Sequence, residues 1–186
     1  MVKSKLILFL YLLYHYFSII TSWAFSTVEP LEDRWCLATK ERVLLSAQYM
    51  VSCDTEENGC KGGETPRVFK FLENIGTVSE ECVPYQAING TCMDKCTNGE
   101  AFPKMFKCQK DSHKQFRDVD VIKRELMING PMHCAFHVYS DFKEYRSGIY
   151  YQVSDKYLGG HGIQLVGWGW ENGINYWIMK NSWVNN

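Results

Sequence analysis

The chain has 186 residues, a usual length for a single domain. Hydrophobic residues make up 46% of it and charged residues 22%, a composition that excludes an intrinsically disordered protein. The formal net charge is −1, so no basic surface is predicted and nucleic acid is not expected as a partner.

The first five residues carry two lysines and are followed by an apolar run over residues 6–20. A positive start before a short apolar run is typical of a secretory signal peptide, and the run is shorter than the roughly 20 residues that span a bilayer. We therefore assign residues 1–20 to a signal-like segment. Two alternatives stay open: a signal-anchor that contacts a membrane through residues 6–20, and an artefact of a misplaced start or exon. Cleavage after Ala24 would cut into the first predicted helix.

Helical patterns fill the first part of the remaining chain. Apolar residues at helical spacing predict a helix over residues 22–37. Pro30 lies inside it and is expected to kink or split it, because an interior proline costs about 3 kcal/mol. Shorter helices are predicted at 46–52, 65–75 and 119–128.

The pattern changes to that of strands after residue 131. Apolar segments bounded by glycine and polar turns predict strands at 134–139, 148–151, 163–168 and 174–179. The chain is therefore helical first and β-rich second. We expect an α+β fold of two lobes, with a cleft between them as the natural site.

The chain contains eight cysteines, seven of them within residues 36–108. Cys134 stands apart in an apolar strand and is expected to be a buried free thiol. A disulfide framework in an oxidising compartment is favoured. The alternative is a zinc site, which would need Cys92, Cys96 and His113 and lacks a second pair of ligands at short spacing. No metal is expected.

Residues 89–91 (NGT) form an N-glycosylation sequon in a polar loop between Cys82 and Cys92. Asn89 is therefore a candidate glycosylation site. The sequon agrees with a route through the secretory pathway, either to a lysosome or vacuole or to the outside of the cell.

Three short segments carry residues suited to catalysis. They are residues 22–26 (SWAFS) at the start of the first predicted helix, 159–162 (GGHG) just before a predicted strand, and 180–183 (KNSW) just after the next. Each segment alone is weak evidence for an active site, because a histidine beside glycines is more often an ordinary loop residue. Together, with His161 and Asn181 on successive strands, they resemble the papain family of cysteine peptidases.

The resemblance covers nearly all of residues 21–186, which we assign to a papain-like peptidase domain. Residues 60–63 (CKGG) are similar to the glycine-containing segment that lines the family's substrate cleft. Residues 32–36, 129–131 and 138–150 are similar to the cathepsin B branch.

The resemblance implies a two-lobe papain-like fold and a cysteine-type endopeptidase that needs no cofactor and takes a peptide or protein substrate. His161 would be the acid and base, Asn181 would orient its ring, and Trp183 would shield their hydrogen bond. The span between Cys82 and Cys96 is short and contains no histidine. Exopeptidases of the cathepsin B branch carry a long histidine-bearing loop there, so the resemblance implies an endopeptidase. Five residues would line the cleft: Trp23, Gly62, Gly63, Gly160 and Trp183.

The nucleophile position departs from the family pattern, because Ser22 stands where the family has cysteine. A hydroxyl has no ionised form near neutral pH, whereas a thiol has an ordinary pKa of about 8.5. Tyr16 stands where the family has the glutamine that binds the oxyanion, and losing one such donor typically costs about 10²–10³ in rate. We therefore expect little or no peptidase activity.

The resemblance also implies the disulfides Cys53–Cys92 and Cys82–Cys96. Three cysteines have no assigned partner: Cys36, Cys60 and Cys108. Ile19 stands where the family has the cysteine that would pair with Cys60. One replaced N-terminal segment, by divergence or by gene-model error, would explain these losses. Compared with the family, we expect a fold incomplete at both ends and only marginally stable.

Four hypotheses follow. In the first, the gene product carries cysteine at position 22 and acts as a peptidase, which the transcript sequence upstream of Trp23 tests. Alternatively, the chain is a non-catalytic secreted protein that binds peptides. A serine hydrolase using Ser22 and His161 is disfavoured, because asparagine lacks the carboxylate that stabilises imidazolium. The last reading is a vestigial cleft on a membrane-anchored protein.

Overall fold

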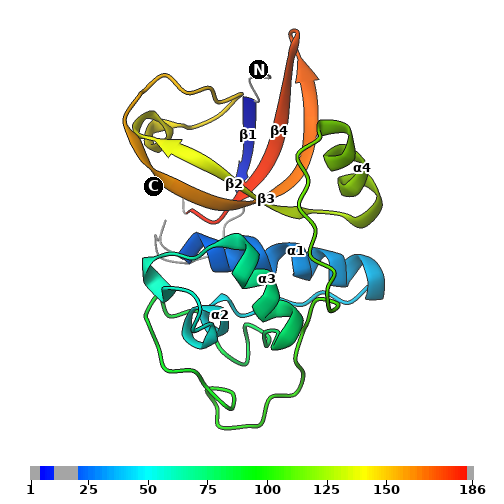
Figure 1. Ribbon diagram of the computed structural model, residues 1–186, viewed down its shortest axis with the longest axis vertical. Helices are drawn as coiled ribbons and strands as arrows, with labels where there is room; N and C mark the ends of the chain where they lie inside the picture. The colour runs from blue at the N-terminus through cyan, green and yellow to red at the C-terminus, as the bar shows by residue number, and fades with distance from the viewer. Residues whose placement is uncertain (1–4, 11–20, 184–186) are drawn as a thin grey trace.

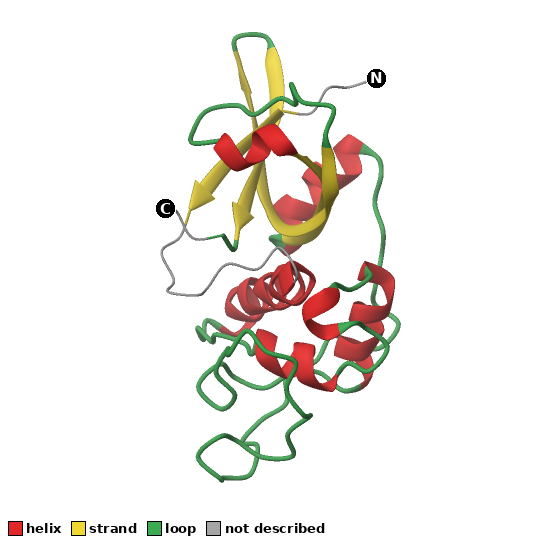
Figure 2. Cartoon of the chain, turned by 90° about the vertical axis from the view of Figure 1, so that its left-hand side faces the viewer, coloured by secondary structure: helices red, strands yellow, loops and turns green. Residues whose placement is uncertain are grey.

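A computed structural model describes residues 5–10, for which only the backbone is described, and residues 21–183. Figures 1 and 2 show two lobes, one built mainly from helices and the other built around a sheet. Within residues 21–183 the predicted order, helices first and strands second, is confirmed, and so is the α+β class, although one strand precedes the first helix at residues 5–10.

The helical lobe is formed by the first half of the chain. Its elements are α1 (Ser22–Thr39), α2 (Ala47–Cys53), the 3-10 turn η2 (Gly59–Lys61) and α3 (Thr65–Asn74). Ser46 begins α2, because its hydroxyl accepts a hydrogen bond from the backbone N–H of Tyr49 at 2.9 Å. Pro66 lies in the first turn of α3, where a missing N–H costs no hydrogen bond.

The split predicted at Pro30 is wrong, since α1 is unbroken on both sides of it. The Pro30 side chain is buried, and α1 lies between the two lobes (Figure 1), with Trp23 and Val28 packed into the helical core. Burial of one such apolar side chain contributes about 1.5–3 kcal/mol, so a few of them outweigh the cost of the interior proline.

In the described part of the chain, the sheet lobe has four strands in the order β1-β4-β3-β2. Its elements are β1 (Lys5–Leu10), α4 (Val119–Asn129), β2 (Met132–Tyr139), the 3-10 helix η3 (Ser140–Glu144), β3 (Tyr157–Glu171) and β4 (Ile174–Asn181). The pairs β2–β3 and β3–β4 are antiparallel, whereas β1 pairs with β4 in parallel.

Two strand predictions need correction. Residues 148–151 do not form a strand, and only Tyr150 takes part in a single β-bridge. There the chain is held by side chains instead, because Asp141 accepts hydrogen bonds from the Tyr150 hydroxyl and from the backbone N–H of Val153, both at 3.0 Å. Residues 159–162 do not precede β3 but lie inside it, since pairing with β2 begins at Tyr157.

Part of the predicted signal-like segment belongs to the sheet. Residues 5–10 form β1 along the outer edge of β4, so this edge of the sheet is covered. Residues 1–4 and 11–20 lie outside the described part of the chain, and cleavage or anchoring of the segment stays a prediction. Among the helices that the structure describes, none is long and apolar enough to cross a membrane.

The structure contains both disulfides implied by the resemblance, Cys53–Cys92 and Cys82–Cys96, and both lie in the helical lobe. Cys92 and Cys96 are therefore unavailable as zinc ligands. Four cysteines are free: Cys36, Cys60, Cys108 and Cys134. Burial raises the pKa of the Cys134 thiol to about 11, as expected for an unreactive thiol inside a strand.

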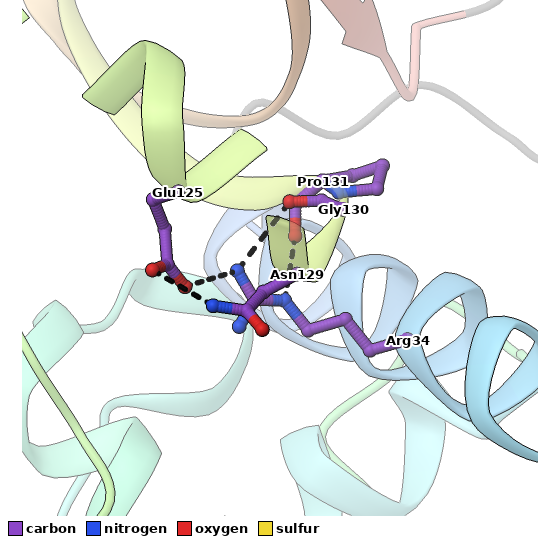
Figure 3. A network of polar contacts seen from close by, with 5 residues as sticks. All are labelled: Arg34, Glu125, Asn129, Gly130 and Pro131. Atoms are coloured by element: carbon purple, nitrogen blue, oxygen red, sulfur yellow. Dashed lines mark hydrogen bonds and ion pairs between the residues drawn. The ribbon is translucent and has the colours of Figure 1, made fainter. Parts of the chain in front are cut away.

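Polar contacts join α1 of the helical lobe to the sheet lobe. Figure 3 shows Arg34 of α1 at the end of α4, donating to the carbonyl oxygen of Pro131 at 2.9 Å and to the Glu125 carboxylate at 3.2 Å. Asn129 donates to the other oxygen of the same carboxylate at 2.9 Å. Earlier in α1, Glu29 forms an ion pair with Lys180 of β4 at 3.2 Å. These contacts link α1 both to the end of α4 and to the sheet.

Candidate active site

The histidine and the asparagine singled out in the sequence meet on neighbouring strands. The Oδ1 atom of Asn181, at the end of β4, lies 2.7 Å from Nε2 of His161 in β3. Both side chains are almost fully buried, with exposed fractions of 1% for His161 and 3% for Asn181. Because an amide oxygen can only accept, Nε2 carries the proton and Nδ1 of a neutral ring has the free lone pair.

Aromatic rings enclose the imidazole of His161. The Trp183 ring lies 4.7 Å from it, between centroids, and the Phe136 ring meets it edge-on at 5.7 Å. Burial lowers the pKa of His161 to about 4, although the Asn181 hydrogen bond opposes this shift. The ring is therefore neutral at physiological pH. Its Nδ1 atom has no hydrogen-bond partner among the described residues.

Ser22 begins α1, directly beside this pair. Its side chain is buried, and its hydroxyl oxygen accepts a hydrogen bond from the backbone N–H of Gly162 at 3.3 Å. Gly162 is the residue after His161, so the helix start and the strand meet at the predicted site. The Ser22 hydroxyl and Nδ1 of His161 do not form a hydrogen bond with each other.

Gly162 is required for this close approach of α1 to β3. A Cβ atom at residue 162 would lie 2.5 Å from the Ser26 hydroxyl and 3.3 Å from the backbone oxygen of Ser22. The first contact is shorter than real Cβ atoms show and the second is tight, so with any side chain here the Ser26 hydroxyl would have to move and α1 and β3 would be crowded. The sequence contained this glycine, but nothing in it indicated what would face the missing side chain.

Trp23 ties the segment at 59–63 to the start of α1. Its indole N–H donates to the carbonyl oxygen of Gly59 at 3.0 Å. A Cβ atom on Gly63 would lie only 2.6 Å from the indole ring, so the ring fills the space that a side chain would need. Gly62 has a φ of 118°, which favours glycine. The structure thus brings Trp23 and Gly63 together next to Ser22. A Cβ atom at Gly62 or at Gly160 would meet nothing within 4 Å, so both positions face open space, and their part in a substrate cleft stays a prediction.

Two polar groups near the site were missed in the sequence. Glu57 is buried and accepts hydrogen bonds from the backbone N–H of Glu64 at 2.7 Å and from Arg67 at 3.1 Å, which fixes the segment that follows Gly63. In the sequence, the only signal for this pair was a glutamate ten positions before an arginine on a predicted helix, and that signal is weak.

The second missed group is His133 of β2, which bridges the lobes. Its two ring nitrogens lie 3.0 Å from the hydroxyls of Ser26 in α1 and Thr65 in α3. Burial lowers the pKa of His133 to about 4, so the bridge is made by a neutral ring. No local pattern could have indicated it, because its partners are far apart in the sequence.

This arrangement, in which a helix start faces a buried His–Asn pair across two lobes, defines a papain-type active-site framework. Residues 20–186 match the family described as papain family cysteine protease. The chain belongs to this family.

Two of the similar proteins are named cathepsin B or cathepsin B-like. Cathepsin B-like CP3 of Giardia intestinalis is 43% identical over 168 residues, which is 87% of this chain and 56% of that protein. Cathepsin B of Dictyostelium discoideum is 38% identical over 179 residues, 87% of this chain and 57% of that protein. The chain thus spans just over half the length of the curated relatives it matches.

Solved structures agree with this placement. The chain is similar to procathepsin B S9 from Trypanosoma congolense, with a TM-score of 0.79 and 32% identity, over 88% of this chain and 58% of that one. It is also similar to digestive procathepsin L 3 of Tenebrio molitor larval midgut, with a TM-score of 0.71 and 26% identity, over 88% and 53% of the two chains. The two-lobe, papain-like expectation is therefore confirmed.

Proposed function

We propose that this chain is a cathepsin B-like protein that binds peptides at the junction of its lobes without hydrolysing them. The observation that carries the proposal is Ser22, which occupies the first position of α1 beside an intact His161–Asn181 pair. The framework that would hold a peptide is kept, whereas the nucleophile is changed.

Three features oppose catalysis by Ser22. Its hydroxyl oxygen accepts the N–H of Gly162 and makes no hydrogen bond with Nδ1 of His161, so the proton has no direct path to the base. A histidine with a pKa of about 4 is a weak base at neutral pH. The orienting partner is Asn181, which unlike a carboxylate cannot stabilise the imidazolium that general-base catalysis would form.

The surface beside Ser22 supports peptide binding. Gly62, next to Gly63 and Trp23, is only partly buried, and a Cβ atom there would meet nothing within 4 Å, so its backbone faces open space that an extended chain could occupy. Backbone groups of this kind bind a peptide main chain irrespective of its sequence. The partner would therefore be a peptide or protein segment.

Purified chain tests the proposal with two measurements. Hydrolysis of a fluorogenic peptide library should be no faster for the wild type than for Ser22→Ala, while fluorescence anisotropy should show that both bind labelled peptides. Hydrolysis that disappears in Ser22→Ala would reject the proposal. Absence of binding in both proteins would reject peptide recognition and favour a vestigial cleft.

A second candidate is a cysteine-type peptidase whose gene product carries cysteine at position 22, and the intact His161–Asn181 contact at 2.7 Å favours it. The transcript sequence decides between serine and cysteine. Ser22→Cys tests whether the framework still activates a thiol, because a helix start lowers a thiol pKa. We expect a peptidyl electrophile to alkylate the introduced thiol faster than Cys108 or Cys134, whose pKa values burial raises to about 11.

The two disulfides of the helical lobe support a route through an oxidising compartment. We extend this to the secretory pathway, ending in a lysosome or vacuole or outside the cell. Membrane contact through residues 6–20 remains a separate hypothesis, which carbonate extraction of membranes from expressing cells would test.

A further inference from the structure

The loop that carries the sequon lies on the surface of the helical lobe and takes no part in the active site. Asn89 and Thr91 are exposed, and the neighbouring Ile88 has an exposed fraction of 52%. The chemistry of N-glycosylation needs the side-chain nitrogen of Asn89 and the hydroxyl of Thr91. Among the described residues, neither atom has a hydrogen-bond partner.

The other half of the Asn89 amide is fixed to the protein. Its oxygen accepts a hydrogen bond from the backbone N–H of Cys60 in η2 at 2.6 Å. A Cβ atom at Gly59 would clash with this oxygen, so the glycine allows the contact. Because the amide is planar, anchoring its oxygen on η2 leaves the nitrogen on the opposite branch, at the surface.

The base of the loop is rigid. Gln48 is fully buried in α2 and donates to the carbonyl oxygen of Ile88 at 2.9 Å, while its own oxygen accepts the N–H of Gln86 at 2.9 Å. One residue beyond Thr91, Cys92 is tied to Cys53 by a disulfide. A group attached to Asn89 would therefore start from a fixed point, directly beside η2.

We propose that Asn89 carries an N-linked glycan that covers the η2 turn. The transfer forms a bond between the Asn89 nitrogen and the anomeric carbon of an N-acetylglucosamine. It breaks the bond from that carbon to the pyrophosphate of a lipid-linked oligosaccharide donor, and it releases the amide proton with the lipid pyrophosphate. The glycan also covers exposed Ile88.

The covered turn contains a site of protease attack. Lys61, the last residue of η2, is exposed. Gly59 of the same turn accepts the indole N–H of Trp23, so a cut in the turn would disturb the wall beside Ser22. In a compartment that contains proteases, the glycan thus preserves the candidate active site.

The full chain expressed in eukaryotic cells tests the attachment by mass spectrometry of the peptide that contains Asn89. We expect an added N-acetylhexosamine-containing mass in the wild type and none in Thr91→Ala or Asn89→Asp. Both variants destroy the sequon, and both keep an oxygen that can accept from Cys60. An unmodified Asn89 in the wild type would overturn the proposal.

Limited trypsin digestion tests the covering. Cleavage after Lys61 should be several-fold slower in the glycosylated wild type than in Thr91→Ala. The same should hold relative to wild type deglycosylated by an enzyme after folding, which avoids any folding defect of the variant. Cleavage after Arg146, which is 71% exposed in the other lobe, should be equal in all three and serves as the control. Equal cleavage after Lys61 would refute the covering.

Discussion

The helical lobe has a large cluster of buried apolar side chains and two disulfides, whereas the sheet lobe has a smaller cluster and, among its described cysteines, only the free thiol of Cys134. The candidate active site draws on both. The helical lobe supplies Ser22 and Trp23 from a cross-linked core, and the sheet lobe supplies His161 and Asn181 from paired strands.

Because the site takes residues from both lobes, its geometry depends on the contacts between the lobes, here called the joint, as much as on either lobe. The joint is polar and includes the Arg34 network of Figure 3, the Glu29–Lys180 pair and the His133 bridge. Single changes in each lobe and at the joint should therefore have different effects.

The largest effect is expected from removing the long-range cross-link of the helical lobe. Cys53 and Cys92 are 39 residues apart, so losing their disulfide should lower the free energy of unfolding by about 4 kcal/mol. Denaturant unfolding of Cys53→Ala/Cys92→Ala measures it, with Cys134→Ala in the sheet lobe as the control. Equal losses in the two proteins would contradict the contrast between the lobes.

A smaller effect is expected at the joint. Gly162→Val places a side chain against the Ser26 hydroxyl and should cost about 1–3 kcal/mol of stability, as overpacked sites do. Peptide binding should be lost with it. Gly160→Ala is the matched control, because its added methyl meets open space. If both variants keep wild-type stability and binding, α1 does not depend on close contact with β3.

A pH-dependent effect is expected from Glu32 of α1. Burial raises the pKa of this carboxyl from 4.5 to about 8, even though it accepts the N–H of Leu45 at 2.7 Å. A raised folded-state pKa means that its contribution to stability is complete below pH 4.5 and is lost as the pH rises to about 8.

Glu32→Gln should therefore flatten the decline of stability between pH 5 and pH 8. One unit of pKa shift corresponds to about 1.4 kcal/mol, and we expect a difference of that order. Thermal unfolding across this range measures it, with the exposed Glu41→Gln as the control. Parallel pH profiles for the wild type and Glu32→Gln would show that Glu32 does not bind a proton on folding.

Much of the fold was predictable from local patterns. Capping residues and apolar spacing located α2, α3 and α4 to within a residue or two. Pro30 misled the prediction for α1, because a local propensity was outweighed by packing against both lobes. The predicted strand at 148–151 failed for a related reason: its apolar pattern suits a strand, but the Asp141 side chain binds this segment instead.

The site was predictable where the resemblance supplied residues, and the structure places His161 and Asn181 within hydrogen-bonding distance. It was not predictable where tertiary contacts decide. The His133 bridge and the role of Gly162 depend on atoms from α1, α3 and β3 that meet only in the folded chain.

The central claim is that Ser22 is not activated as a nucleophile, although it lies at the start of α1 beside a complete His161–Asn181 pair. Intact-mass measurement after incubation with a fluorophosphonate, a probe that forms a stable bond with activated serines, tests it most directly. The account predicts no adduct on Ser22, so that neither the wild type nor Ser22→Ala gains mass relative to its own untreated sample. An adduct that maps to Ser22 and is absent from Ser22→Ala would contradict it.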